Sequence, residues 1–218
     1  MKHKLLARIL LLASIAGAST LSGWGAPTAG AQDCSDVELI FARGTTEPAG
    51  VGWLGTAFVN TVRTKIGERS MAVYPVNYPA DWNLYTSVRT GASDALAHIQ
   101  STSTNCPDTR IILGGYSQGA GVIDLLAIAK SVGFFAPMPI PPSDEPHIAA
   151  IAVFGNPMRT MNGGGPLDQK SPVYGSRTID QCAAGDGYCA GGSDTSGHFA
   201  YVRNGMVDQA ATFVTDHL

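Results

Sequence analysis

Hydrophobic and polar positions alternate along the chain with two different spacings, and these spacings predict strands and helices in turn. The segment 148–154 is almost continuously apolar, as expected for a strand whose two faces are both buried in a parallel sheet. Other runs of β-branched and apolar residues predict strands over 37–42, 71–76, 110–114 and 177–180, of which the last is short.

Between these strands, apolar residues recur at helical spacing. Leu54, Phe58, Val62 and Ile66 fall on one face of a predicted helix over 53–66. Further helices are predicted over 87–102, 120–130 and 201–217. Because strands that alternate with helices are typical of βα units, we predict an α/β fold, a three-layer α/β/α sandwich around a largely parallel five-stranded sheet.

Residues 1–31 have the composition of a secretory signal peptide. Three basic residues within the first eight positions precede an apolar core over 9–18, and residues 29–31 supply the small side chains of a cleavage site. We therefore predict cleavage after Ala31, which leaves residues 32–218 as a single domain. An uncleaved membrane anchor is the alternative, but the apolar core is short for a membrane span.

Removal of this leader changes the formal net charge from −3 to −6, because the leader contains three basic residues and no acidic ones. The remaining lysines and arginines are scattered singly, which argues against a nucleic-acid partner. No second apolar run of comparable length follows, so we expect no integral membrane segment in the mature chain.

All four cysteines follow the predicted cleavage site, and an even number in an exported chain indicates two disulfides. Three pairings are possible, and we favour Cys34 with Cys106 and Cys182 with Cys189. Their spacing is unlike that of zinc-binding motifs. In the loop-entropy description the long bridge stabilises the fold by about 4.4 kcal/mol and the short bridge by about 2.5 kcal/mol. The short bridge should mainly fix the shape of its own loop.

A candidate nucleophile lies in the sequence Gly115-Tyr116-Ser117-Gln118-Gly119, between the strand over 110–114 and the helix over 120–130. A sharp turn at this point would hold the serine in a strained conformation at the carboxyl edge of the sheet, and the glycines would let strand and helix approach. The motif alone is weak, because a chain this rich in glycine and serine contains it by chance about 0.2 times.

A serine nucleophile needs a base, and the base needs a carboxylate that holds its tautomer. Three histidines follow Ser117. His147 immediately precedes a buried strand, at the wrong end for a site at the carboxyl edge, and His217 is the penultimate residue. His198 follows a loop of small residues near the start of the last predicted helix, and we predict that it is the base.

The cysteines help to select the carboxylate. Asp186 lies between the third and fourth cysteines, in a loop that their bridge would hold rigid, and it precedes His198 in the chain order used by α/β-hydrolases. We predict that Asp186 completes a triad, although an ordinary Asp-Gly turn is the structural alternative. Asp180 and Asp194 are competing candidates, and Asp124 is a weaker one.

Two donors are expected for the oxyanion of a tetrahedral intermediate. The backbone N–H of Gln118, directly after the nucleophile, is one of them, and Thr45 in the loop after the first strand is predicted to be the other. Alternatively, Thr45 or Thr46 caps the following helix. The loops over 133–146 and 156–175 could line a crevice at the same sheet edge, although the first of them could equally be a packed proline-rich connector.

The segments 41–45, 115–119, 182–189 and 198–201 together resemble the cutinase family of secreted serine esterases, in particular its actinobacterial-type branch. The resemblance covers essentially the whole mature chain. It implies the α/β-hydrolase fold in minimal form, both disulfides as paired above, no metal and no cofactor. For the site it implies a triad of Ser117, Asp186 and His198 with an oxyanion hole of Thr45 and Gln118.

One segment departs from the family pattern. Fungal cutinases have an apolar segment before the catalytic histidine, whereas residues 191–197 are small and polar here, which disfavours polymeric cutin. The apolar residues over 134–140 could compensate.

We therefore expect a secreted, monomeric serine carboxylic-ester hydrolase that acts on short- to medium-chain acyl esters, whether small molecules, lipids or polyesters. The alternatives are an acetylxylan esterase and a non-catalytic exported lipid-binding protein. A serine peptidase is disfavoured because nothing suggests a peptide subsite.

Overall fold

A parallel sheet of five strands in the order β2-β1-β3-β4-β5 forms the centre of the fold. The computed structural model describes residues 34–218, so the predicted leader and its cleavage site lie outside the described residues. The strands are β1 (Val37–Ala42), β2 (Met71–Pro75), β3 (Arg110–Tyr116), β4 (Ile148–Phe154) and β5 (Thr178–Gln181). The predicted five-stranded parallel sheet is confirmed.

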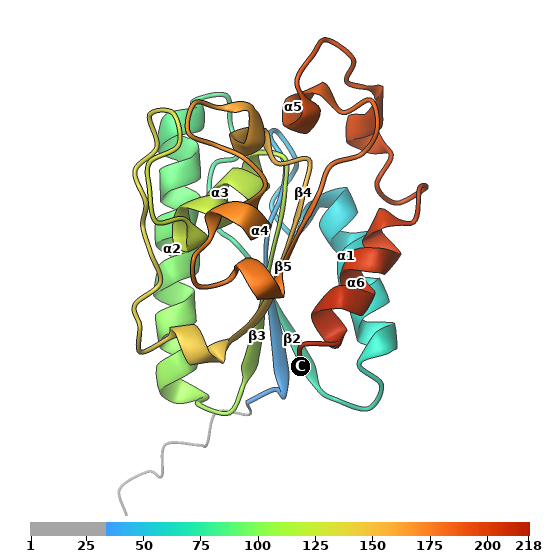
Figure 1. The fold of residues 1–218 in the computed structure, drawn as a ribbon. Helices are drawn as coiled ribbons and strands as arrows, with labels where there is room; N and C mark the ends of the chain where they lie inside the picture. The colour runs from blue at the N-terminus through green and yellow to red at the C-terminus, as the bar shows by residue number, and fades with distance from the viewer. Residues whose placement is uncertain (1–33) are drawn as a thin grey trace, which may run out of the picture. The chain divides into compact units, whose positions relative to one another are not determined.

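Helices cover both faces of this sheet, with α1 and α6 on one face and α2, α3 and α4 on the other (Figure 1). The α-helices are α1 (Gly52–Lys65), α2 (Leu84–Asn105), α3 (Gln118–Ala127), α4 (Leu167–Lys170), α5 (Gly187–Ala190) and α6 (Met206–Thr215). Four short 3-10 helices are η1 (Glu145–His147), η2 (Pro157–Thr160), η3 (Gly175–Arg177) and η4 (Ser196–Phe199). No helix within residues 34–218 is long and apolar enough to span a bilayer.

Two hydrophobic cores result, one on each side of the sheet. Along β3, Ile111 and Leu113 belong to the core under α2 and α3, whereas Ile112 between them belongs to the core under α1 and α6. All three side chains are fully buried. This alternation follows from the two-residue period of a strand, and it explains why the central strands are apolar at almost every position.

The last predicted helix begins later than expected. Helix α6 starts at Met206 rather than at 201, because Gly205 at its N-cap has a φ of 81° and the preceding residues form turns. Helix α3 ends at Ala127, three residues before its predicted end, since Ile128 is extended. Helix α2 is longer than predicted at both ends.

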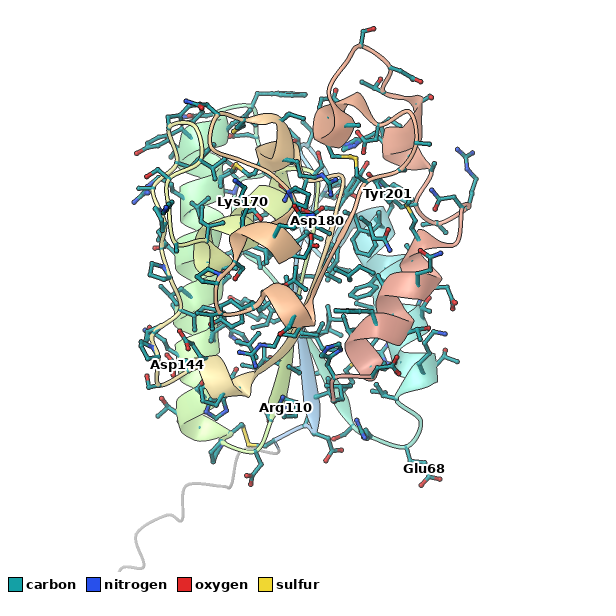
Figure 2. The ribbon with its side chains drawn as sticks, viewed as in Figure 1. Glu68, Arg110, Asp144, Lys170, Asp180 and Tyr201 are labelled. Carbon is teal, nitrogen blue, oxygen red and sulfur yellow. A yellow bond between two sulfur atoms is a disulfide. The ribbon has the colours of Figure 1, made fainter. Side chains whose placement is uncertain are left out.

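Two disulfides fix opposite ends of the molecule. Cys34 is bonded to Cys106, which ties the start of β1 to the end of α2, and Cys182 is bonded to Cys189 in the loop after β5 (Figure 2). This is the pairing favoured from the sequence. The short bridge lies at the carboxyl edge of the sheet, where the strands lead into the candidate site.

Candidate active site

Ser117 stands at the turn between β3 and α3. Its backbone has a φ of 55° and a ψ of −117°, and its N–H donates a hydrogen bond to the carbonyl of Phe154 at 2.9 Å. The flanking glycines are required by close packing, because a Cβ on Gly119 would lie 2.0 Å from the Ala42 carbonyl oxygen. A Cβ on Gly115 would lie 2.3 Å from the carbonyl oxygen of Gly119. The strained turn expected from the sequence is therefore present.

His198 and Asp186 lie in line with this serine. His198 Nε2 is 2.9 Å from Ser117 Oγ, and His198 Nδ1 is 2.8 Å from Asp186 Oδ2. The Asp186 side chain is fully buried and the His198 ring nearly so. The structure thus brings together the three residues that the sequence singled out, from the β3–α3 turn, the loop after β5 and η4.

Tyrosines fix the orientation of the histidine and the aspartate. The Tyr201 hydroxyl donates a hydrogen bond to Asp186 Oδ2, and the Tyr116 hydroxyl donates to the His198 carbonyl at 2.8 Å. The Tyr116 ring is stacked on the imidazole with centroids 4.9 Å apart. Tyr201 lies toward the end of the sheet opposite Arg110 (Figure 2). Sequence reasoning did not assign a role to Tyr201, although it follows His198 by three residues.

Hydrogen bonding keeps Asp186 ionised in its buried position. Burial alone would raise the pKa of this carboxyl, but hydrogen bonds from His198 and Tyr201 and from the Tyr188 N–H lower the pKa below its ordinary value. An ionised Asp186 can hold the imidazole in the tautomer whose Nδ1 carries the proton, so that Nε2 is free to accept one from Ser117.

Gly155 makes room for this arrangement beneath the histidine. It follows β4 with a φ of 58°, and a Cβ at this position would lie 2.9 Å from both Asp186 Oδ2 and the His198 ring. A larger residue is disfavoured here for two reasons, the backbone conformation and the close contact with Asp186 and His198.

The competing carboxylates lie elsewhere. Asp124 and Asp180 are buried behind the site, where the Asn156 side-chain amide donates to Asp124 Oδ1 at 3.2 Å and to Asp180 Oδ2 at 3.1 Å. Burial is the main cause that raises the pKa of both carboxyls. Arg159 pairs with Asp180 at 3.2 Å. This network supports the loop after β4 and does not contact Ser117.

The remaining candidates are also outside the site. Asp194 is exposed, and its carboxylate accepts a hydrogen bond from the Ser196 N–H at 2.9 Å. His147 ends η1 before β4, at the opposite sheet edge, and His217 contacts the Phe213 carbonyl near the C-terminus.

Thr45 lies in a loop that Glu47 and Arg43 hold in place. Glu47 Oε2 accepts a hydrogen bond from the Gly44 N–H at 2.5 Å, and Glu47 Oε1 accepts one from the Trp53 N–H at 2.7 Å. The helix-cap alternative for Thr45 and its neighbour is wrong, because the N-cap of α1 is Val51.

Arg43 is buried beneath this loop. Its guanidinium donates from Nε to the Glu47 carbonyl and from Nη2 to the Tyr78 carbonyl, both at 2.8 Å, and it lies 5.0 Å from the Tyr78 ring centroid. The sequence offered no reason to single out either Arg43 or Glu47 beyond their place in the motif around Thr45.

Two pockets meet at Ser117. A wide one of about 460 Å³ extends past His198 and Phe199, and a narrow one of about 90 Å³ extends over Gln118 and Gly121. Both pockets are lined by Thr45, Ser117, Trp82 and Tyr188.

The two loops expected to line a crevice contribute to the narrow pocket. The loop over 133–146 supplies Phe135, while Phe134 is 63% exposed beside it. The segment 156–175 supplies Pro157, Met158 and Met161. Within residues 34–218 no group of three or more His, Cys, Asp or Glu side chains is arranged to hold a metal ion.

Comparison with known proteins identifies the family. The profile of the Cutinase family matches residues 33–218. The chain belongs to the cutinase family. Carboxylesterase Culp1 of Mycobacterium tuberculosis is 43% identical over 218 residues, which cover 96% of each chain. Phospholipase Culp4 of the same organism is 45% identical over 193 residues, which cover 88% of this chain and 83% of the relative.

The structure agrees with this cutinase assignment. The structure of a Trichoderma reesei cutinase in complex with a C11Y4 phosphonate inhibitor has a TM-score of 0.65 and 31% identity to this chain, and the match covers 84% of this chain and 76% of the other. The predicted α/β-hydrolase fold and the expected class of cutinase-like ester hydrolase are confirmed.

Proposed function

We propose that this cutinase hydrolyses carboxylic esters through an acyl-enzyme on Ser117, with His198 as general base and Asp186 as its orienting partner. The proposal rests chiefly on one observation, the continuous hydrogen-bonded line from Ser117 Oγ through the imidazole to a buried carboxylate. Such a line activates a hydroxyl that is otherwise a poor nucleophile.

The reaction takes two steps. His198 Nε2 takes the proton of Ser117 as Oγ attacks the ester carbonyl, and the imidazolium then gives that proton to the departing alcohol oxygen, which leaves an acyl-serine. In the second step His198 takes a proton from water, the resulting hydroxide attacks the acyl carbon, and the proton returns to Ser117 as the acid departs.

Each tetrahedral intermediate carries a negative oxygen that needs fixed donors. We assign the Gln118 backbone N–H and Thr45 to this role. The assignment is supported by the position of Gln118 directly after the serine, at the first turn of α3, and by the contact of Thr45 with both pockets that meet at Ser117.

The substrate range is proposed from the pockets. A narrow apolar pocket beside an open site suits short- to medium-chain acyl groups, and the polar segment before His198 disfavours polymeric cutin as the principal substrate. The curated relatives are named a carboxylesterase and a phospholipase, both of which are ester hydrolases.

Initial rates on p-nitrophenyl esters from acetate to palmitate test the proposal. We expect a maximum between butyrate and octanoate, and we expect Ser117→Ala to remove turnover while its circular dichroism spectrum and melting temperature match the parent. Ser143→Ala, at an exposed serine before β4, is the matched control and should retain full activity.

Three results would change the assignment. Activity in Ser117→Ala equal to that of the parent would refute the assignment of Ser117 as the nucleophile. Rates on acetate and acetylated xylan alone would favour the acetylxylan esterase alternative. A folded protein with no rate on any ester would favour the lipid-binding alternative.

We also propose that the protein acts outside the cell as a monomer. Two disulfides and the predicted leader support export. N-terminal sequencing of the exported protein should begin at Gln32, and light scattering should give the mass of one mature chain. Retention of the leader would contradict the proposed cleavage, and a larger mass would contradict the monomeric state.

A further inference from the structure

The two pockets contact different members of the proposed machinery. His198 and Phe199 line the wide pocket and not the narrow one, whereas Gln118 and Gly121 line the narrow pocket and not the wide one. The imidazolium must reach the departing alcohol oxygen in order to protonate it. The alcohol part of the ester therefore belongs on the His198 side, in the wide pocket, and the acyl part belongs in the narrow one.

The lining of each pocket fits this division. The narrow pocket is bounded by Val88, Phe135, Met158 and Met161, which offer apolar contact to an acyl chain. Gly121 lies at its wall, where an added Cβ would meet Met158 Cε at 2.9 Å. An acyl chain here would remain attached to Ser117 after the alcohol has departed.

The wide pocket differs from the narrow one because its lining combines aromatic rings with hydroxyl groups and one carboxylate. The rings belong to Trp53, Trp82, Tyr116, Tyr188 and Phe199. Thr45, Thr46 and Thr195 contribute hydroxyls, and Glu47 contributes the carboxylate. Among the described residues that line this pocket, Glu47 is the one acidic residue, and none is lysine or arginine.

Glu47 is held in this position by the backbone. Its two carboxylate oxygens accept the hydrogen bonds from Gly44 and Trp53 described above, so the charge cannot swing away from an anionic ligand. An alcohol that carries a phosphate would place like charge beside Glu47 in a pocket whose lining includes no lysine or arginine, whereas a polyol can pair with the threonine hydroxyls.

We propose that the wide pocket binds the alcohol part of the ester and that Glu47 selects an uncharged, hydroxyl-rich alcohol over one that carries a phosphate. This inference rests on the proposed function and names the substrate class of that same site. Like-charge repulsion across a few ångströms of a partly exposed pocket disfavours the phosphorylated alcohol by about tenfold per unit charge.

The test compares two esters that differ only in the phosphate, 1-octanoylglycerol and 1-octanoylglycerol 3-phosphate, each below its aggregation concentration. We expect kcat/KM to favour the neutral ester by about 30-fold or more, since the phosphate carries nearly two charges. Glu47→Gln should remove most of this preference, a reduction of about 30-fold, whatever it does to the rate on both esters. In the parent enzyme, 1 M NaCl should reduce the preference as well.

Glu145→Gln is the matched control, because it removes the same charge from η1, before β4 at the opposite sheet edge. It should leave the preference unchanged.

Equal kcat/KM for the two esters, or a preference that neither Glu47→Gln nor salt reduces, overturns the inference. So does the absence of hydrolysis of both glycerol esters by an enzyme that still cleaves p-nitrophenyl butyrate through Ser117, a result that leaves the proposed function intact. Loss of p-nitrophenyl butyrate cleavage would refute the proposed function instead.

Discussion

The Thr46 N–H donates a hydrogen bond to the Ala80 carbonyl at 2.6 Å, and both residues have a positive φ, 62° for Thr46 and 52° for Ala80. With Ser117 they are the three residues other than glycine in this conformation within residues 34–218. Left-handed backbone at such residues costs of order 1 to 3 kcal/mol each, and it persists only where the surroundings impose it. Arg43, which bonds the Glu47 and Tyr78 carbonyls, joins the same two loops.

We predict that Arg43→Met lowers both stability and activity. Loss of its charged hydrogen bonds should decrease the free energy of unfolding by about 2 to 4 kcal/mol, because the carbonyls that it bonds lose their donors. The loop with Thr45 should also loosen, with a fall in kcat of about tenfold. Urea unfolding and steady-state kinetics measure the two effects. Arg63→Met, at an exposed position on α1, is the control, and an unchanged kcat in folded Arg43→Met would show that the loop does not depend on this residue.

Gly155→Ala should lower kcat strongly, whereas a glycine replacement away from the site should not. Its Cβ would collide with Asp186 and His198, and displacement of these groups by about 1 Å costs about 100-fold in kcat. Gly67→Ala is a matched control, because Gly67 has a φ of 67° and nothing lies within 4 Å of an added Cβ. Both variants should lose about 1 kcal/mol of stability from backbone strain, and Gly155→Ala should lose about 1 to 3 kcal/mol more, because its Cβ displaces buried groups. Similar kcat values for the two variants would contradict the proposed contact.

The two disulfides should separate stability from activity. Replacement of Cys34 and Cys106 by alanine removes a bridge with a sequence separation of 72, and should lower the free energy of unfolding by about 4.4 kcal/mol with kcat of the folded enzyme nearly unchanged. Replacement of Cys182 and Cys189, separated by 7, should cost about 2.5 kcal/mol but lower kcat about tenfold, because Asp186 lies in that loop. A larger fall in kcat on removal of the long bridge than on removal of the short bridge would contradict this prediction.

Asp124→Asn should make stability less dependent on pH. Burial, and then the nearby charge of Asp180, raise the pKa of Asp124 well above its ordinary value of 3.8. Above pH 3.8 the folded protein therefore keeps a proton that the unfolded chain loses, and this contribution to stability falls as pH rises toward the raised pKa.

In that interval the stability of Asp124→Asn relative to the parent should increase by up to about 1.4 kcal/mol per pH unit. Urea unfolding at pH 5 and pH 8 measures the difference, with Asp216→Asn as the control at an exposed carboxyl. The same pH dependence in Asp124→Asn and the parent would contradict the prediction.

Much of the fold follows from local pattern. The strand β4 is buried on both faces, so its sequence is a continuous apolar run that predicts a strand. The helix α1 is buried on one face, so its apolar residues recur at helical spacing and predict a helix. Helix α6 was predicted too early, because nothing in its apolar pattern showed that Gly205 would adopt a left-handed conformation and start the helix there.

Within the site, the sequence by itself determined the residue types that can react, their chain order, and a glycine-flanked serine between a strand and a helix. Only the tertiary structure decided that the predicted acid and base meet at that serine, since Asp180 at β5 bonds Asn156 whereas the loop after β5 brings Asp186 to His198. Three contacts join residues that are well separated in the chain: Arg43 with the Tyr78 carbonyl, Gly155 with Asp186 and His198, and Tyr201 with Asp186. Glu47 bonds the nearby Gly44 and Trp53, but only the folded shape of that loop brings their N–H groups to its carboxylate. The physical reason is that local periodicity specifies which side of a strand or helix is buried, whereas a hydrogen bond between side chains from separate loops depends on how the sheet brings those loops together.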